Sequence, residues 1–512
     1  MTHISRSTLI IAVFFGIDKI AALVRQVLMP RVYSTSDLDV FLAANNIPDL
    51  LSVLISGGAL GVALIPVLSE HLEQGGRTAA WELFSRVLNL AFIITGLLAV
   101  ILSMFAEWIV GTWIAPGFRP EQIELAAELM RLDLYAIMIF SISGLVMAGL
   151  QANQHFLFPA MAPVLYNAGQ IFGIIVFSTE SEFSIGPITL PAGLGLGIHG
   201  LVYGVILGAG LHLLVQVPAL LRFGFRWQPG LGLNTPGVRK TLRLLVPRVL
   251  TMVCIQWFFL LRDNLASRLG EGSVTGLNYG WFLMQVPETL IGTALAIAIL
   301  PTLAEEFVRR DDDAFRETIN RGIRVMLGLT VPAAAVLAAG IRPVIGIIGL
   351  EPHVADLAVI STQVYLAGLA GHALLEIAAR SFYARQDART PMVAAFLNLV
   401  LLYSVLAIAL YRPFGVAGIA AANSVAFTVE ATVLFILLRR KVPGIFRARS
   451  TVLRAVAGAA AGAGVVLAVN AVAGSFVSGG FAEILAGLGA LAAGGLAALP
   501  FIWPEIKLVV KL

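Results

Sequence analysis

Charged residues are scarce in this 512-residue chain. Asp, Glu, Lys and Arg make up only 12% of it, whereas 58% of the residues are hydrophobic and the mean hydropathy is +0.90. Too few polar groups are present to cover soluble domains, so the composition indicates a membrane protein. The single cysteine, Cys254, excludes an intramolecular disulfide, and we interpret it as a small core residue.

Motifs for catalysis and nucleotide binding are also missing. None of the five lysines follows a glycine, which excludes a phosphate-binding GxxxxGK[ST] loop, and no HExxH segment occurs. Gly195, Gly197 and Gly200 spell GxGxxG, but the sequence predicts no strand before them, so we interpret them as the entry to a helix. The sequence therefore predicts a protein that is not an enzyme and that uses no cofactor.

Long apolar runs account for most of the chain. They alternate too weakly for an outer-membrane barrel, and a helical span needs about 20 apolar residues. The runs predict fourteen transmembrane helices, near residues 8–29, 38–69, 83–110, 126–150, 158–178, 192–221, 241–268, 274–304, 318–349, 355–383, 389–411, 414–438, 451–474 and 480–503. The last two are rich in Ala and Gly, which fits either tight mutual packing or a groove for a lipid tail.

The basic residues are distributed unequally between the two sides of the membrane. Of the 34 Lys and Arg residues, 24 fall in segments on the side of the termini and 5 in the opposite segments. Because Lys and Arg accumulate in cytoplasmic loops, both termini are predicted to be cytoplasmic, in a multi-pass membrane protein. Basic loops facing anionic lipid also explain the pI of 9.3 without a nucleic-acid partner.

Two segments recur at nearly one spacing. ALGVALIPVLSEH from Ala59 returns as ALAIAILPTLAEE from Ala294, and QANQHFLFPAMAPVLYN from Gln151 returns as YARQDARTPMVAAFLN from Tyr383. The spacing holds six spans, so the halves are predicted to point the same way. The fold class is thus an all-α polytopic membrane protein with two pseudo-symmetric six-helix lobes, residues 1–221 and 241–438. Residues 222–240 are the cytoplasmic linker, and residues 439–512 add two helices and a short tail.

Charges within the first span indicate a polar chamber. Asp18 and Arg25 are seven residues apart and share one face of the helix, beside Lys19. A charge in mid-bilayer costs about 2.5–3.5 kcal/mol, so this face should line a cavity. Two cations and one acid favour an anionic ligand such as phosphate, and a structural ion pair is the alternative. For Arg262 and Asp263, a local pair and a transport-pathway site are equally open.

Several runs together resemble the MurJ (MviN) family of lipid II flippases, within the multidrug/oligosaccharidyl-lipid/polysaccharide exporter superfamily. They are RSFYARQDARTP from Arg380, QANQHFLFPAMAPVLYN from Gln151, NNIPDLL from Asn45 with GGALGVALIPVLSEH from Gly57, and EGSVTGLNY from Glu271 with ALAIAILPTLAEE. The resemblance implies alternating-access transport of undecaprenyl-pyrophosphate-linked peptidoglycan precursor. It also implies a central cationic cavity for the pyrophosphate and headgroup, and a groove at the last two helices for the prenyl tail.

The resemblance also assigns residues to that cavity. Lys19 and Arg25 match its two basic residues in the first helix, and Asp39 matches an acid at the start of the second. Where the family has arginine, this chain has Ser52 and Phe282, and Gly57 replaces a nearby acid; Arg262 is our hypothetical substitute. The family motif comprises Arg380, Tyr383, Arg385, Gln386 and Asp387.

Sodium is a further partner that the resemblance raises. Asp263 and Asn398 match sodium ligands of some members, but Leu402 replaces a second carboxylate. We expect a monomer among membrane lipids, driven by the membrane potential. The alternatives are a flippase for another polyprenyl-pyrophosphate-linked glycan, a transport-inactive scaffold of cell-wall synthesis and, more distantly, a membrane glycosyltransferase.

Overall fold

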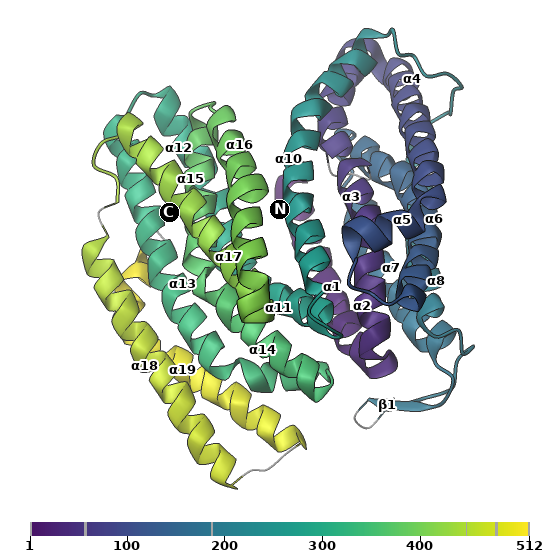
Figure 1. The fold of residues 1–512 in the computed structure, drawn as a ribbon. Coiled ribbons are helices and arrows are strands. Elements are labelled where there is room, and N and C mark those ends of the chain that lie inside the picture. Colours follow the sequence, from purple (N-terminus) through teal and green to yellow (C-terminus); the bar gives the residue numbers. More distant parts are fainter. Residues whose placement is uncertain (1–2, 56–58, 186–187, 447, 477–479, 510–512) are drawn as a thin grey trace. The chain divides into compact units, whose positions relative to one another are not determined.

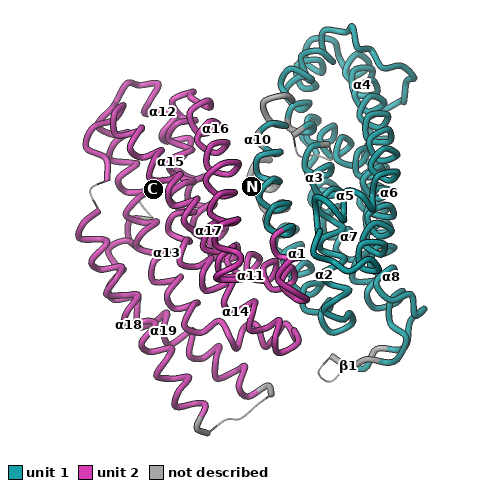
Figure 2. Tube along the Cα trace, in the orientation of Figure 1, with its two compact units in different colours: residues 1–264 teal, residues 265–512 magenta. Residues whose placement is uncertain are grey.

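The computed structural model describes residues 3–55, 59–185, 188–446, 448–476 and 480–509 (Figure 1). Contacts divide the chain into two compact units, Met1–Asn264 and Leu265–Leu512 (Figure 2). Both are built of helices, which confirms the predicted all-α class. A short hairpin was not predicted: strands β1 (Phe183–Ile185) and β2 (Ile188–Leu190) pair antiparallel in unit 1.

Unit 1 contains the following helices, with π-helical segments written η. They are α1 (His3–Val32), α2 (Thr35–Ala44), α3 (Asn46–Ile55), α4 (Ala59–Met104), α5 (Ala106–Ile109), η1 (Val110–Ile114), α6 (Pro120–Ala152), α7 (Leu157–Phe172), η2 (Gly173–Ser178), α8 (Ile198–Leu214), α9 (Val217–Arg222) and α10 (Pro236–Ala266).

Unit 2 contains the remaining helices. They are α11 (Ser273–Pro287), η3 (Glu288–Thr293), α12 (Ala294–Val308), α13 (Asp312–Ile348), α14 (Pro352–Ala367), α15 (Leu369–Ala384), α16 (Arg389–Phe396), η4 (Leu397–Tyr403), α17 (Ser404–Lys441), α18 (Arg449–Phe476) and α19 (Gly480–Val509). The contacts group α10 with unit 1, whereas the sequence predicts it as the first helix of the second lobe. The division into lobes at 221 and 241 stays a prediction.

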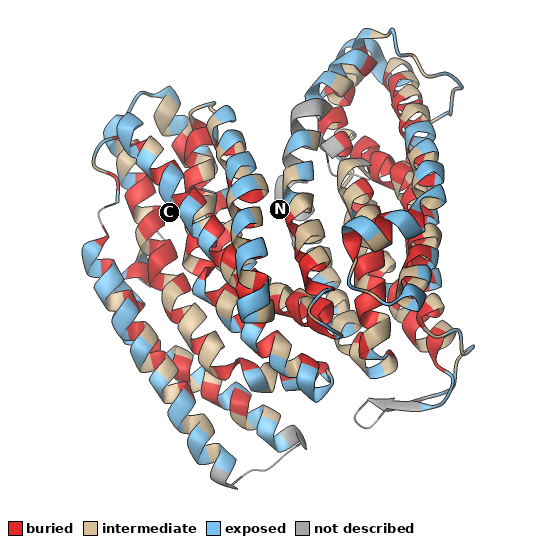
Figure 3. Cartoon of the chain, in the orientation of Figure 1, coloured by how far each residue is buried: buried red, intermediate tan, exposed pale blue. Residues whose placement is uncertain are grey.

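Exposed residues occur along the helices of each unit (Figure 3). Many of them are large and apolar, among them Ile93, Leu97 and Leu496, which are 52%, 61% and 66% exposed. Such surfaces are stable in lipid rather than water. By length and composition, nine helices of the described residues can cross a membrane, or ten if α14 and α15, bent by 45°, form one span. The predicted count of fourteen therefore stays a prediction.

Several predicted span boundaries coincide with breaks in longer helices. Gly76 (φ 73°) interrupts α4 and Gly415 (φ 59°) interrupts α17, and positive φ suits glycine because it lacks a Cβ. Conversely, the predicted span 38–69 is not one helix: it is divided into α2, α3 and the start of α4. The break between α2 and α3 falls at Asn45, three residues before Pro48.

The backbone repeats the predicted duplication. Gln154 and Gln386 are 232 residues apart, and both take the left-handed conformation, with φ of 58° and 60°. Their amides donate to the carbonyls of Gln151 and Tyr383, each at 2.9 Å. A second correspondence involves the GxGxxG run: Gly197 and Gly415 have φ of 55° and 59° with ψ of −138° in both. The run is therefore a helix entry with a counterpart in unit 2.

Close contact between α7 and α8 fixes the helix that carries much of the site. A Cβ added to Gly169 or Gly173 would lie 2.4–2.5 Å from the backbone of Gly208 or Gly204. Glycines four residues apart on each helix let the two backbones approach at this distance, as in small-residue membrane interfaces. This close contact fixes the position of α7 and therefore the positions of its polar side chains Asn167 and Gln170.

Candidate functional site

The polar face of α1 packs against α7. The Asp18 Oδ1 atom accepts a hydrogen bond from Asn167 Nδ2 at 2.8 Å, and Arg25 Nη1 donates to Gln170 Oε1 at 2.9 Å. Asn167 and Gln170 are three residues apart and share a face of α7. Both are almost fully buried. The two amides thus fix the positions of the Asp18 carboxylate and the Arg25 guanidinium. Because both amides are neutral, neither one neutralises the charge of its partner.

Lys19 is oriented differently from its two polar neighbours. Its side chain is 61% exposed, and its ammonium lies 4.0 Å from Asp18 Oδ2 and 4.9 Å from the Phe15 ring centroid. The contact with Asp18 is long and solvent-accessible, so it is a weak ion pair. Lys19 therefore remains accessible to an external anion, while Arg25 is half-buried and held.

Arg262 and Asp263 form a buried pair on α10. Their side chains are 3% and 1% exposed, and Arg262 Nε donates to Asp263 Oδ1 at 2.7 Å. The other carboxylate oxygen accepts from Asn46 Nδ2 of α3 at 2.8 Å, and the guanidinium lies 5.1 Å from the Phe259 ring centroid. Of the two alternatives that the sequence left open, this geometry supports the local pair.

An acid of α3 alters the charge balance at Arg25. Asp49 is close enough to interact electrostatically with both Arg25 and Asp263. The sequence predicted two cations, Lys19 and Arg25, facing the single acid Asp18. That balance was incomplete, because α3 brings a second carboxylate to the same group. The described part of unit 1 therefore has a site of mixed charge, in which the cations Lys19 and Arg25 lie near the carboxylates of Asp18 and Asp49.

The other predicted cavity residues lie in varied surroundings. Asp39 is on α2 and only 1% exposed, within the packed interior of unit 1, whereas Ser52 is half-buried on α3. Phe282 is half-buried on α11 of unit 2. Gly57 lies outside the described residues. At the positions of Ser52 and Phe282 the family has arginine. In this chain neither side chain can supply a cation.

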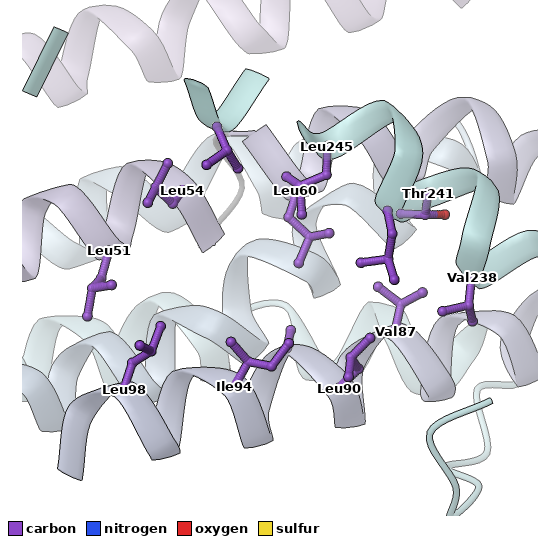
Figure 4. Close-up of a pocket in the computed structure, with 13 residues that line it drawn as sticks. Leu51, Leu54, Leu60, Val87, Leu90, Ile94, Leu98, Val238, Thr241 and Leu245 are labelled. Carbon is purple, nitrogen blue, oxygen red and sulfur yellow. The ribbon is translucent and has the colours of Figure 1, made fainter. Parts of the chain in front are cut away.

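An apolar pocket of about 250 Å³ lies between α3, α4 and α10 (Figure 4). Leu51 and Leu54 contribute from α3, Leu98 from α4 and Leu245 from α10, and Thr241 is the polar residue of its lining. A pocket of this composition accommodates hydrocarbon and offers little to a phosphate or sugar.

One of the two expected sodium ligands does not fit that ion. Both oxygens of the Asp263 carboxylate are bonded, one of them to a guanidinium that sodium would have to displace. Asn398, in unit 2, donates its Nδ2–H to Glu430 Oε2 at 2.7 Å, and its Oδ1 atom has no hydrogen-bond partner within the described residues. Asn398 therefore keeps an oxygen for a cation whereas Asp263 does not, so the sodium site that the resemblance implies is incomplete.

The FYARQD motif forms a turn that ties helix ends of unit 2 together. Asp387 accepts from the Thr390 amide at 3.1 Å, from the Thr390 hydroxyl at 2.8 Å and from Lys441 Nζ at 2.7 Å. The Arg385 guanidinium lies 5.1 Å from the Phe307 ring centroid, which is on α12. The turn therefore links α15 to the ends of α12, α16 and α17.

The rest of the motif lies on α15. Arg380 pairs with Glu376 at 2.8 Å, and Gln386 supplies the left-handed residue that ends the helix. Tyr383 is 42% exposed. The motif residues are thus mostly engaged with one another and with neighbouring helices, which is a structural role.

Replacing Asp387 with alanine should destabilise unit 2 by about 1 kcal/mol, the usual cost of losing a helix-capping side chain. The bonds from Lys441 and Thr390 lower the pKa of Asp387 to about 2 from its ordinary value of 3.8. A carboxyl with a depressed pKa stabilises the fold above its unfolded pKa, and this contribution is lost as the pH falls toward 2. Unfolding midpoints in detergent should therefore separate the two proteins from pH 7 down to about 4 and converge below that. A constant difference down to pH 2 would contradict the assignment.

Several residues of the site were not predicted from the sequence. Asn46, Asn167 and Gln170 are neutral amides within apolar runs, and they bond to charges that lie 145–217 residues away in the chain. The one local signal was that Asn46 and Asn167 fall inside the motifs NNIPDLL and QANQHFLFPAMAPVLYN. A polar amide in a span is itself a sign of a buried partner.

These features define a class of protein. Apolar outer faces, a duplicated helical architecture and charges held on buried helix faces belong to a polytopic membrane transporter.

Solved structures agree on the fold. An inward closed conformation of lipid II flippase MurJ has a TM-score of 0.79 at 19% identity, covering 96% of this chain and 98% of that one. An inward-facing MATE-family transporter of the MOP superfamily has a TM-score of 0.68 at 14% identity, covering 83% and 94%.

Sequence comparison identifies the family. The model of the family described as lipid II flippase MurJ matches residues 32–487, and the chain belongs to that family. Lipid II flippase MurJ of Burkholderia cenocepacia is 29% identical over 459 residues, covering 87% of this chain and 85% of that protein. A probable lipid II flippase MurJ of Haemophilus influenzae is 29% identical over 443 residues, covering 82% and 83%.

Proposed function

We propose that this protein is a lipid II flippase, which moves undecaprenyl-pyrophosphate-linked peptidoglycan precursor across the bacterial plasma membrane without catalysing a reaction. Membership of the MurJ family supports the substrate class. The observation that carries the proposal is the Arg25 guanidinium, which donates a hydrogen bond to the neutral amide of Gln170. An amide orients the guanidinium without neutralising it, and the charge that Asp49 does not offset remains for an anionic ligand.

The roles of the individual residues follow from this arrangement. Lys19 and Arg25 contact the diphosphate, and Asn167 and Gln170 position the face of α1 that carries them. Asp39 and Arg262 support this site from the packed interior of unit 1, the latter through its pair with Asp263. Ser52 and Phe282 contribute no charge, so the diphosphate relies on fewer cations than in family members with arginine there.

The driving force follows from the charge of the substrate. Both termini are cytoplasmic in the proposed orientation, and the protein functions as a monomer among membrane lipids. Moving one elementary charge across 100 mV is worth about 2.3 kcal/mol, so the membrane potential biases the passage of an anionic headgroup outward. The prenyl tail stays in lipid while the two units alternate in access to the headgroup.

The test is restoration of growth in a conditional flippase-depleted strain, together with lipid II translocation in vesicles that contain the purified protein. The proposal expects both growth and translocation. Translocation of another polyprenyl-pyrophosphate-linked glycan but not lipid II would support the sister-flippase alternative, which the neutral Ser52 and Phe282 favour. Growth without any translocation would identify a scaffold of cell-wall synthesis and overturn the proposal.

A further inference from the structure

A polar cavity lies in unit 2, beside the C-terminal end of α18 and the N-terminal end of α19. Its volume is about 480 Å³, and α13, α14, α18 and α19 all contribute to its lining. These helices pack closely, since a Cβ added to Gly487 of α19 would lie 2.2 Å from Pro343 of α13. Closely packed helices therefore form the wall of the cavity.

The lining carries one charge of each sign. Arg342 comes from α13 and Glu483 from the first turn of α19, and α18 adds the amide of Asn470 to the lining. One Arg342 nitrogen bonds Asp356 at 2.7 Å, and the guanidinium has further donors to offer. Within the described residues, Glu483 has no hydrogen bond or ion pair to another side chain.

Apolar residues complete the lining and reach the outer face of the unit. Ile360 of α14 is 42% exposed and Leu467 of α18 is 58% exposed, and both line the cavity. In a membrane protein, such outward-facing side chains contact hydrocarbon. The cavity thus presents a cation, an anion and an amide next to a surface for acyl chains.

We propose that this cavity binds a zwitterionic phospholipid with a primary ammonium group, phosphatidylethanolamine. The phosphate accepts hydrogen bonds from Arg342 and Asn470, and the ammonium donates to the Glu483 carboxylate; charge-assisted hydrogen bonds of both kinds are strong. The acyl chains lie along Ile360 and Leu467. A quaternary ammonium cannot donate a hydrogen bond to Glu483, and an anionic headgroup leaves that carboxylate without a cation. The proposal concerns a bound membrane lipid and is independent of the transported substrate.

The experiment measures lipid binding to the full-length, delipidated protein by native mass spectrometry, with phosphatidylethanolamine, phosphatidylcholine and phosphatidylglycerol of identical acyl chains. The wild type should bind phosphatidylethanolamine about tenfold more tightly than phosphatidylcholine, the value of one strong hydrogen bond. Glu483→Gln should reduce this preference to about twofold or less. Arg342→Gln should weaken the binding of all three lipids.

Glu351→Gln is the matched control, because Glu351 is also an exposed acid of unit 2, makes no capping hydrogen bond with its side chain and does not line the cavity. It should keep the wild-type preference. Equal binding of the ethanolamine and choline lipids by the wild type would overturn the proposal, as would an undiminished preference in Glu483→Gln. Tighter binding of phosphatidylglycerol than of phosphatidylethanolamine by the wild type would assign the cavity to anionic lipid and would also overturn it.

Discussion

Replacing Arg25 with alanine should abolish growth of flippase-depleted cells and reduce lipid II translocation in vesicles to background. A charge-assisted hydrogen bond contributes about 1.5–3 kcal/mol, so its loss weakens diphosphate binding roughly 10- to 150-fold. The substitution also leaves the carboxylate of Asp49 without the cation beside it and the Gln170 carbonyl without its donor. The Asp49 carboxylate and the Gln170 carbonyl would then both repel an anionic headgroup. The measurement is the rate of lipid II translocation at equal protein content.

The variants of neighbouring residues distinguish ligand contact from folding. Arg25→Lys keeps the charge but lacks the planar fork, so it should retain partial activity. Gln170→Met leaves the guanidinium present but unoriented, and should raise the apparent KM for lipid II more than it lowers kcat. Lys19→Ala should reduce translocation less than Arg25→Ala, because the Lys19 side chain is 61% exposed and its contact with Asp18 is long. Wild-type translocation by Arg25→Ala at normal membrane levels would refute the role that we propose for Arg25.

The sequence predicted the helical class and the polar face of α1 because both depend on local properties. Apolar runs specify helices in lipid, and the 100° periodicity of a helix places Asp18 and Arg25 on one face. The partners of this face could not be derived in the same way. Gln170 is 145 residues from Arg25, and its position depends on the close contact of Gly169 and Gly173 with α8. Such contacts are set by the tertiary fold.

The segmentation of the helices shows a similar limit. Hydropathy identifies a long apolar run, but it does not reveal where the backbone leaves helical geometry. Gly76 and Gly415 interrupt helices with positive φ, whereas most other glycines of the spans remain helical. Gly197 of the GxGxxG run and Gly415 have nearly the same φ and ψ, and this equivalence was not predicted from the sequence.

The family motif illustrates the difference between recognising residues and explaining them. Arg385, Gln386 and Asp387 identified the family, yet nothing in their order indicated that Asp387 binds Lys441, 54 residues further along. The structure gives these residues a role in holding helix ends of unit 2. A residue that identifies a transporter family therefore need not contact the transported molecule.

The buried pair on α10 provides the second prediction with a large expected effect. Arg262→Ala should lower the free energy of unfolding of unit 1 by about 3–5 kcal/mol, since it leaves the Asp263 carboxylate buried without a cation. The measurement is the unfolding midpoint of the purified protein in detergent, compared with wild type. An unchanged midpoint would contradict the local pair as a stabilising feature of the fold.

The double variant Arg262→Met with Asp263→Asn separates stability from transport. It removes both charges while the carbonyl of the new side-chain amide still accepts the hydrogen bond of Asn46, so most of the lost stability should return. Because the pair bonds within unit 1 and is nearly inaccessible, we expect translocation to return with stability. Recovery of stability without translocation would instead mean that a charge of this pair is needed for transport. If Asp263→Asn alone translocates lipid II, that charge is the one on Arg262, which would then be the substitute for the arginines absent at Ser52 and Phe282.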